Sequence, residues 1–334
     1  MANITKSENS LYSKIQNDFI GLDTVYTLAD GRKTVQVYLD STASTLMMGA
    51  AHDILEEFFD HYANSHSLLH FSAKITTNQY AWAHQRILSF LGADPEEYTC
   101  FFTGSGTTAG INRMARVFRD YRKDKDVVLV SIMEHHSNDL PHRKHAGKVV
   151  HIPLKSHSSG EPGCLNTELL QENLEKYRDR VNYVAVTGIS NVTGIINPIH
   201  DIAELAHSYG ALILIDGAQM AAHMPVQMSG YSNPAKNIDA FVFSGHKTYV
   251  PGSPGVVVCR KDILTAIEPE ELGGGMVEDV FVDKYIIKDY FPDREEAGTP
   301  NIPGAIALST AIEIMDRIGM ETIYGEEDEL VLDT

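Results

Sequence analysis

The sequence predicts an α/β domain built on a mostly parallel, doubly wound sheet. Apolar runs of strand length alternate with amphipathic stretches of helical length, and Gly and Pro cluster at turns such as residues 251–255. That alternation is typical of a sheet covered by helices on both faces. The chain has 334 residues and 43% hydrophobic content, which is enough to bury a large core.

Seven apolar runs predict the strands of this sheet, in chain order: 99–103, 127–132, 148–153, 183–189, 211–215, 240–243 and 255–259. The clearest amphipathic stretches predict helices at 107–118, 167–177 and 199–208. No internal repeat or low-complexity segment interrupts this pattern, so we expect a single doubly wound unit.

Charge and composition limit the partners. The chain carries 27 Lys and Arg against 45 Asp and Glu, a formal charge of −18, which disfavours nucleic acid and anionic membranes. No apolar run approaches the roughly 20 residues of a membrane span, and the polar residues 1–7 do not suit a secretory signal, so we expect a cytoplasmic protein. Cys100, Cys164 and Cys259 lie far apart, which predicts reduced thiols without a disulfide or a metal site.

Lys247 and Asp216 each follow an apolar run and suggest one cofactor. An amine at the edge of a buried sheet loses its proton by desolvation and can form a Schiff base with an aldehyde, of which pyridoxal phosphate is the obvious example. A carboxylate against the pyridine nitrogen would keep that nitrogen protonated. Taken singly, Asp216 is equally consistent with a helix cap and Lys247 with a solvated loop lysine.

The turn at residues 103–108 follows a predicted strand and opens a predicted helix. Its backbone N–H groups and the helix dipole form an anion site, to which Thr107 and Thr108 add hydroxyl donors. A tight turn without a ligand is the alternative. His135 also follows a predicted strand, and its ordinary pKa suits proton relay. Metal binding is the competing interpretation, but His135 and the histidines that follow it lack a zinc-type spacing, so no metal site is predicted.

Seven ordered motifs resemble the class V aminotransferase family of pyridoxal phosphate enzymes, and within it the cysteine desulfurase and selenocysteine lyase branch. They lie at residues 38–44, 103–112, 133–138, 190–194, 216–219, 244–247 and 296–301. Any one of them is weak, but their shared order over most of the chain makes chance similarity improbable. The resemblance implies the fold type I large domain, with a seven-stranded sheet, and pyridoxal 5'-phosphate as the cofactor.

The resemblance also implies roles for individual residues. Lys247 would form the Schiff base, Asp216 would face the ring nitrogen, and His135 would lie on the ring and relay protons. The cofactor-binding set that we expect comprises Thr107, Thr108, His135, Asn191, Asp216, Gln219, Ser244, His246, Lys247 and Thr299. Within it, Asn191 and Gln219 match positions that contact the ring oxygen, although both suit ordinary turns.

Two further implications concern the partner subunit and the substrate. Thr299 matches a residue that reaches the phosphate of the neighbouring subunit, which implies a homodimer. His66 and His70 match a pair on the substrate side, but Ser67 and Leu68 replace the arginine and glycine usual between them. The two histidines are equally consistent with one polar face of a short helix.

The expected division is an N-terminal segment at 1–40, a cofactor-binding large domain at 41–310, and the start of a small domain at 311–334. In the family that small domain carries an arginine for the substrate carboxylate and, in desulfurases, a nucleophilic cysteine. Its remainder is absent here, so the sequence is either a fragment or works without that lobe. Cys100 and Cys259 are expected to be buried, and we name no catalytic cysteine.

These observations predict a pyridoxal phosphate enzyme that acts on a small amino acid. Its activity is expected to be most like that of a cysteine desulfurase, which converts cysteine to alanine and enzyme-bound sulfur and passes the sulfur to an acceptor protein. Lys247 or His135 would move the α-proton, while Asp216 sustains the positive ring. Selenocysteine lyase, β-elimination, epimerase and aminotransferase activities, and a non-catalytic remnant of the fold, remain as alternatives.

Overall fold

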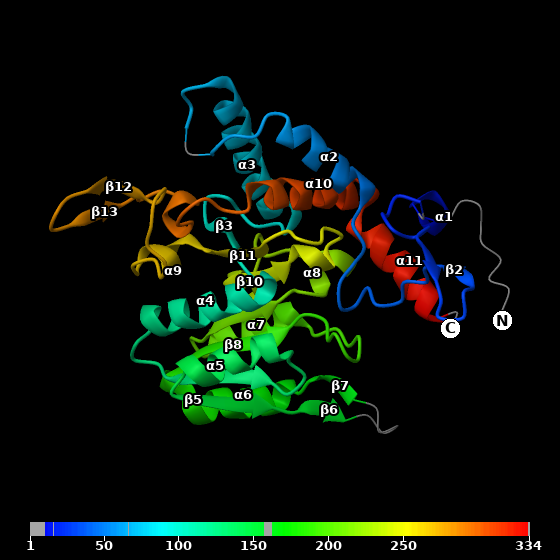
Figure 1. The fold of residues 1–334 in the computed structure, drawn as a ribbon. Coiled ribbons are helices and arrows are strands. Elements are labelled where there is room, and N and C mark those ends of the chain that lie inside the picture. Colours follow the sequence, from blue (N-terminus) through cyan, green and yellow to red (C-terminus); the bar gives the residue numbers. More distant parts are fainter. Residues whose placement is uncertain (1–10, 16, 66, 157–161, 333–334) are drawn as a thin grey trace.

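The computed structural model describes residues 11–15, 17–65, 67–156 and 162–332, and a seven-stranded sheet forms its centre (Figure 1). In spatial order the strands are β3 (Tyr98–Thr103), β11 (Gly255–Arg260), β10 (Ala240–Ser244), β9 (Leu212–Asp216), β8 (Val181–Thr187), β4 (Val127–Ser131) and β5 (Lys148–Ile152). All seven predicted strands are therefore present.

The sheet is mostly parallel, as predicted. The neighbours from β10 through β9, β8 and β4 to β5 run parallel, whereas β11 runs antiparallel to both β10 and β3. Parallel strands must be buried on both faces, which explains why the sequence shows continuous apolar runs rather than alternation. Every residue of β4, β8, β9 and β10 is buried.

Helices cover the two faces of the sheet and divide the core into two apolar clusters. On β10, Phe241 and Phe243 belong to one cluster, and Ala240 and Val242 belong to the other. The cluster around Phe241 lies under α2 (Gly49–Phe59), α3 (Phe71–Phe90), α6 (Thr167–Tyr177), α7 (Ile199–Ser208), α8 (Met220–His223) and α10 (Ile302–Ile318). The cluster around Val242 lies under α4 (Gly106–Tyr121) and α9 (Lys261–Thr265).

The three predicted helices correspond to α4, α6 and α7, but the sequence analysis missed α3, which has 20 residues. The buried positions of α3 include the polar residues Thr76, Tyr80 and His84. Because these residues interrupt the apolar stripe, the helical period is weak in the sequence, and tertiary packing stabilises the helix instead.

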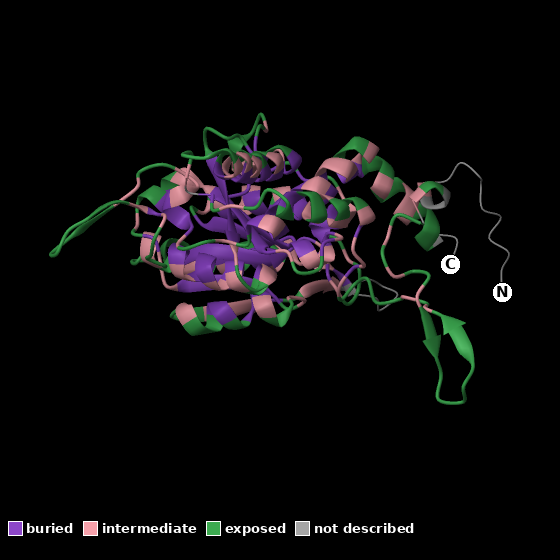
Figure 2. Cartoon of the chain, turned by 45° about the horizontal axis from the view of Figure 1, so that its top comes forward, coloured by how far each residue is buried: buried purple, intermediate pink, exposed green. Residues whose placement is uncertain are grey.

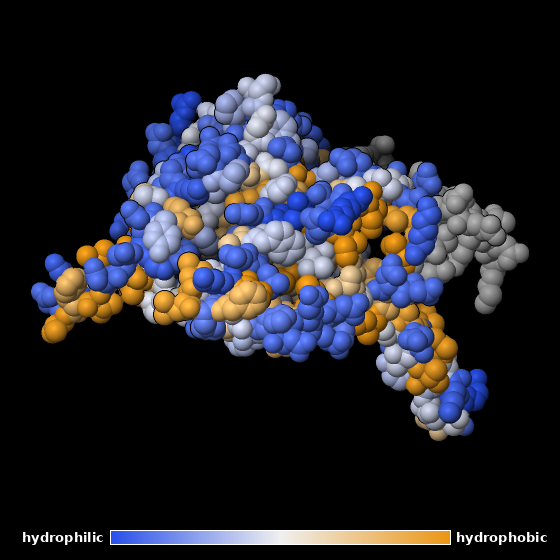
Figure 3. Space-filling view, turned by 90° about the horizontal axis from the view of Figure 1, so that it is seen from above, coloured by the Kyte–Doolittle hydropathy of each residue, from blue (hydrophilic) through white to orange (hydrophobic). Residues whose placement is uncertain are grey.

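Three antiparallel hairpins project from the main body: β1 (Val25–Thr27) with β2 (Lys33–Val35), β6 (Leu154–Ser156) with β7 (Pro162–Leu165), and β12 (Val277–Val280) with β13 (Tyr285–Ile287). Exposed apolar side chains lie along the β12–β13 hairpin, which extends far from the buried core (Figures 2 and 3). The remaining helices are α1 (Leu11–Ile15), α5 (Leu140–His145) and α11 (Met320–Leu332).

Residues 311–318 and 320–332 are helical. α10 continues to Ile318 and buries Ile312 and Met315, and Gly319, with φ +96°, separates it from α11. We therefore propose Gly319 rather than residue 310 as the end of the large domain. Within the described ranges, no helix is both long enough and apolar enough to cross a bilayer.

Close packing of α4 on the sheet depends on Gly110. A Cβ at this position would lie 2.5 Å from Val242 Cγ1 and 2.9 Å from Val257 Cγ2. We expect Gly110→Ala to lower the free energy of unfolding by about 1–3 kcal/mol, because the helix must move away from the sheet. Urea denaturation followed by circular dichroism measures this loss.

Gly325→Ala is the matched control, because Gly325 is also helical and its added Cβ would meet no atom within 4 Å. There the substitution should be neutral or stabilising, by up to about 1 kcal/mol. Equal urea midpoints for the two variants would contradict this account of the α4 packing.

Candidate functional site

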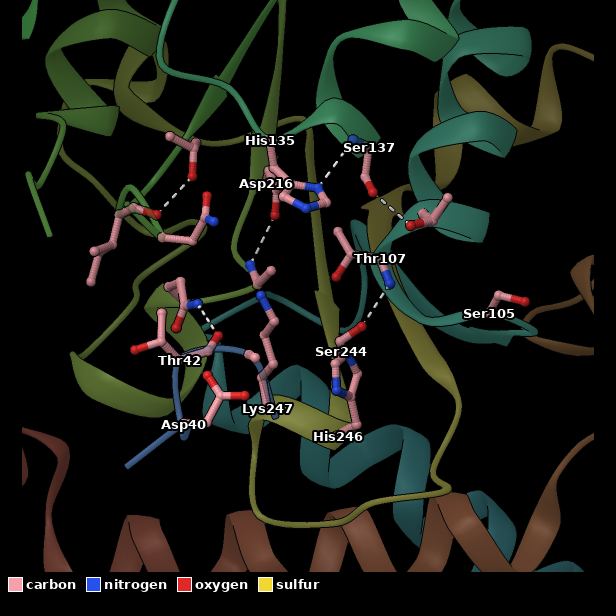
Figure 4. Close-up of a pocket in the computed structure, with 17 residues that line it drawn as sticks. Asp40, Thr42, Ser105, Thr107, His135, Ser137, Asp216, Ser244, His246 and Lys247 are labelled. Atoms are coloured by element: carbon pink, nitrogen blue, oxygen red, sulfur yellow. Dashed lines mark hydrogen bonds between the residues drawn. The ribbon is translucent and has the colours of Figure 1, made fainter. Parts of the chain in front are cut away.

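A cavity of about 490 Å³ opens at the carboxyl ends of the parallel strands (Figure 4). This is the edge at which open α/β sheets bind ligands. The cavity is lined by Asp40, Thr42, Ala43, Ser105, Thr107, Thr108, His135, Ser137, Thr187, Ile189, Asn191, Asp216, Ala218, Gln219, Ser244, His246 and Lys247. The structure thus brings together every predicted cofactor-binding residue except Thr299.

Asp216 and Lys247 approach the cavity from adjacent strands. Asp216 ends β9, and Lys247 lies in the 3-10 helix η4 (Gly245–Lys247) directly after β10, which runs parallel to β9 and pairs Val242 with Asp216. Asp216 is 3% exposed, and one carboxylate oxygen accepts a hydrogen bond from Ala218 N at 3.0 Å.

Burial shifts the pKa of both groups. Desolvation raises the pKa of Asp216 to about 6, although the backbone N–H of Ala218 and the charge of Lys247 oppose that shift. Desolvation also lowers the pKa of Lys247, against the favourable charge of Asp216. A neutral amine, the nucleophilic form, is therefore more accessible at Lys247 than at an exposed lysine.

The turn from β3 into α4 forms a cup of hydrogen-bond donors. Thr107 N donates to Ser244 Oγ at 2.8 Å, which ties the amino end of α4 to the end of β10. Thr107 Oγ1 is buried and has no hydrogen-bond partner in the described part of the chain. Gly106 has φ +58°, and a Cβ there would collide with Ser244 Oγ. An unsatisfied hydroxyl beside a helix amino terminus suits a bound anion such as a phosphate.

His135 precedes the 3-10 helix η1 (His136–Asn138) and caps it, because its Nδ1 accepts a hydrogen bond from Ser137 N at 3.1 Å. Burial and the nearby charge of Lys247 lower the pKa of His135, which favours the neutral ring, and because Nδ1 accepts from Ser137 N, the ring proton lies on Nε2. Ser137 Oγ lies 2.6 Å from Thr108 Oγ1, so the same turn closes one side of the anion cup formed by Gly106, Thr107 and Ser244. In the described ranges no group of three His, Cys, Asp or Glu residues is arranged to hold a metal ion.

The segment at residues 40–43 lines the cavity, although the sequence analysis assigned it to the boundary between an N-terminal segment and the large domain. Gln219 Nε2 donates to Thr42 O at 2.7 Å, and Thr45 N donates to His246 O at 3.0 Å. These bonds hold the segment against the site. The motif at residues 38–44 was noted in the sequence as part of the family resemblance. Nothing in the motif itself indicates that this segment contacts Gln219 and His246.

Thr299 and His70 lie outside this cavity. Thr299 is exposed and lines a separate cavity of about 300 Å³ together with the buried residues Arg113 and Glu295. His70 is exposed at the start of α3, where its Nδ1 accepts a hydrogen bond from Ala73 N at 3.4 Å. It is thus a helix cap rather than part of a helical face, and His66 lies outside the described residues.

The three cysteines also lie away from the cavity lining. Cys100 and Cys259 are buried in strands, as predicted, and burial raises the pKa of both thiols, which makes them poor nucleophiles. Cys164 is partly exposed on β7.

The lining residues fit pyridoxal phosphate as a ligand. The anion cup at Gly106, Thr107 and Ser244 suits its phosphate, the amine of Lys247 suits its aldehyde, and the buried carboxyl of Asp216 suits its basic ring nitrogen. Gly106 and Thr107 follow β3, Ser244 and Lys247 lie at the end of β10, and Asp216 ends β9.

Comparisons with known proteins show which family this chain is similar to. A family model described as aminotransferase class-V matches residues 37–332. A protein named probable cysteine desulfurase from Halalkalibacterium halodurans is 34% identical over 300 residues, which cover 88% of this chain and 70% of that protein.

Two solved structures give the same result. A cysteine desulfurase from Thermococcus onnurineus has a TM-score of 0.78 at 30% identity, over 89% of this chain and 71% of that one. A cysteine desulfurase from Escherichia coli has a TM-score of 0.74 at 30% identity, over 93% of this chain and 73% of that one.

The anion cup makes a direct prediction. We expect Gly106→Ala to weaken binding of pyridoxal phosphate about tenfold or more, because the new methyl group collides with Ser244 Oγ and alanine disfavours the left-handed backbone. Titration of the protein with pyridoxal phosphate, followed by absorbance, measures the dissociation constant. The control is Gly31→Ala, where φ is +82° but a Cβ meets nothing within 4 Å. Unchanged affinity in Gly106→Ala would mean that the phosphate binds elsewhere.

Proposed function

The chain belongs to the class V aminotransferase family, and we propose that it is a pyridoxal phosphate enzyme with cysteine desulfurase activity. The observation that carries this proposal is the convergence of Lys247, Asp216 and the Thr107 anion cup on one cavity. Similarity to proteins named cysteine desulfurase supports the choice of reaction.

When bound, pyridoxal phosphate supplies an aldehyde that combines with amines and a protonated ring that withdraws electrons from the α-carbon of an amino acid. Thr107, Thr108, Ser244 and His246 would hold its phosphate. Asn191 and Gln219 would contact its ring oxygen, and Gln219 is already oriented by its bond to Thr42 O at 2.7 Å.

Lys247, His135 and Asp216 each have a separate role in moving or holding protons in the proposed reaction. Lys247 Nζ, with its pKa lowered by burial, accepts a proton from the α-carbon of the substrate. His135 is neutral for the same reason and accepts from Ser137 N through Nδ1, so its Nε2 carries the ring proton and is placed to donate it. Asp216 stays charged and keeps the ring nitrogen protonated, since a cation beside a buried carboxyl lowers the pKa of that carboxyl.

The same proposal includes a second subunit. The exposed Thr299 would contact the phosphate in the partner subunit, which accounts for its position outside the cavity of its own chain. A symmetric dimer would place two such contacts, one at each site. The cytoplasm as location and a protein that accepts the sulfur are further parts of the proposal.

The test is to incubate the protein with pyridoxal phosphate, cysteine and a reducing thiol, and to measure the products. We expect alanine and sulfide in equal amounts. Pyruvate with ammonia would indicate β-elimination instead. No change in visible absorbance on addition of the cofactor, and none on addition of amino acids, would support a non-catalytic remnant of the fold.

Lys247→Arg tests the role of the amine. Arginine keeps the positive charge but cannot lose its proton, so we expect turnover to fall about 10²- to 10⁴-fold while the phosphate cup is retained. Lys123→Arg, the same change at an exposed lysine, should leave turnover unchanged. Comparable turnover in the two variants would exclude Lys247 as the proton-transfer group.

A further inference from the structure

Glu134 lies at the centre of a partly buried hydrogen-bond network beside the turn that carries His135. Its Oε2 accepts from Asn138 Nδ2 at 2.5 Å, and its Oε1 accepts from Thr187 N at 2.9 Å and from Ser131 Oγ. The network therefore joins the end of β4, the 3-10 helix η1 and the end of β8. Glu134 is not among the predicted site residues and does not line the cavity.

The network continues away from the cavity through two more buried groups. His142 Nε2 lies 3.0 Å from Asn138 Oδ1, and His142 Nδ1 lies 2.8 Å from Tyr183 Oη. Because Asn138 Nδ2 donates to Glu134, its Oδ1 must accept from His142 Nε2, and His142 Nδ1 then accepts from Tyr183. Each donor in this series of hydrogen bonds therefore points towards Glu134.

The Glu134 carboxyl also neighbours Asp216. Thr187, whose backbone N–H donates to Glu134, is the cross-strand partner of Asp216 in the parallel pair of β8 and β9. Paired residues on neighbouring strands lie about 5 Å apart. The negative charge of Asp216 disfavours a second negative charge on Glu134, so Glu134 tends to keep its proton.

Desolvation raises the pKa of Glu134 to about 8; its three hydrogen-bond donors oppose the shift, and the charge of Asp216 adds to it. The other titratable groups near this turn are His135, His136, Asp139, His142, Tyr183 and Lys247. His142, with a pKa lowered by burial to about 3, and Tyr183, with a pKa raised by burial, are both neutral at pH 7. The positive charge of Lys247 acts to lower the pKa of both Asp216 and His135.

Ser131 allows Glu134 to hold a proton without breaking the network. The Asn138 amide and the Thr187 N–H can only donate here, but the Ser131 hydroxyl can either donate or accept. A proton on Glu134 Oε1 can therefore be donated to Ser131 Oγ, while the bonds to Asn138 and Thr187 remain.

We propose that Glu134 is a positioning residue that fixes the turn bearing His135 and remains protonated beside Asp216, which leaves the negative charge of the cavity floor on Asp216. This role rests on the proposed function, because a charge concentrated on Asp216 serves the nitrogen of a bound pyridine ring. Glu134 acts through Asp216 and His135 rather than on the substrate.

The first test needs no cofactor and measures the urea midpoint of the full chain from pH 6.5 to 8.5. Unfolded glutamate has a pKa near 4.3, so in this window the folded chain holds a proton that the unfolded chain has lost. Stability conferred by that proton is lost as the pH rises through about 8. As the pH rises, the urea midpoint of wild type should therefore fall steadily relative to that of Glu134→Gln.

Controls separate this titration from a loss of packing. Glu172→Gln, the same change at an exposed position, should follow wild type at every pH. Asp216→Asn removes the repulsion and should move the fall to lower pH. A constant offset between wild type and Glu134→Gln, or no shift in Asp216→Asn, would overturn the proposal.

The second test measures the dissociation constant of pyridoxal phosphate at pH 7. In Glu134→Gln one of the donors, Asn138 Nδ2 or Thr187 N, must face an amide N–H₂ group, so the turn loosens and binding should weaken about tenfold. Glu172→Gln should bind as wild type does. Unchanged affinity in Glu134→Gln would overturn the positioning role. If wild type binds no cofactor, the proposed function fails, and the stability test still decides the state of Glu134.

Discussion

The site depends on the parallel pairing of β9 with β10. This register places the residues that follow the two strands at one edge of the sheet, so a carboxyl and an amine that are 31 positions apart in the sequence meet in one cavity. The antiparallel strand β11 then returns the chain away from that edge. Without the shared direction of β9 and β10, Asp216 and Lys247 would lie at opposite ends of the sheet.

Burial gives these two groups their chemical character. An exposed aspartate and an exposed lysine form an ion pair with both groups fully charged at neutral pH, which offers neither a nucleophile nor a selective partner for a ring nitrogen. In the cavity, desolvation shifts both pKa values towards neutral pH and is only partly opposed by the mutual attraction. The apolar core on each side of the sheet supplies that low-dielectric surrounding.

Backbone geometry does the corresponding work for the anion cup. Gly106 adopts a left-handed conformation that brings Thr107 N to Ser244 Oγ, and thereby joins the amino end of α4 to the end of β10. Gly110, one turn later, lets the same helix approach the sheet closely enough to keep that junction in place. Two glycines of one helix thus serve the site at different distances, one by its φ angle and one by its lack of a side chain.

The sequence by itself determined the seven strands and many of the residues that line the cavity at their ends, because continuous apolar runs and the polar residues that follow them are local signals. It did not reveal α3, whose buried Tyr80 and His84 break the helical pattern of apolar residues. It also did not reveal the hydrogen bond that Gln219 donates to Thr42. Nor did it single out Glu134, since a glutamate in a sequence carries no sign of the hydrogen bonds that it accepts in the fold. Only the tertiary structure decided these features, because they depend on contacts between segments far apart in the chain, and no local pattern encodes such contacts.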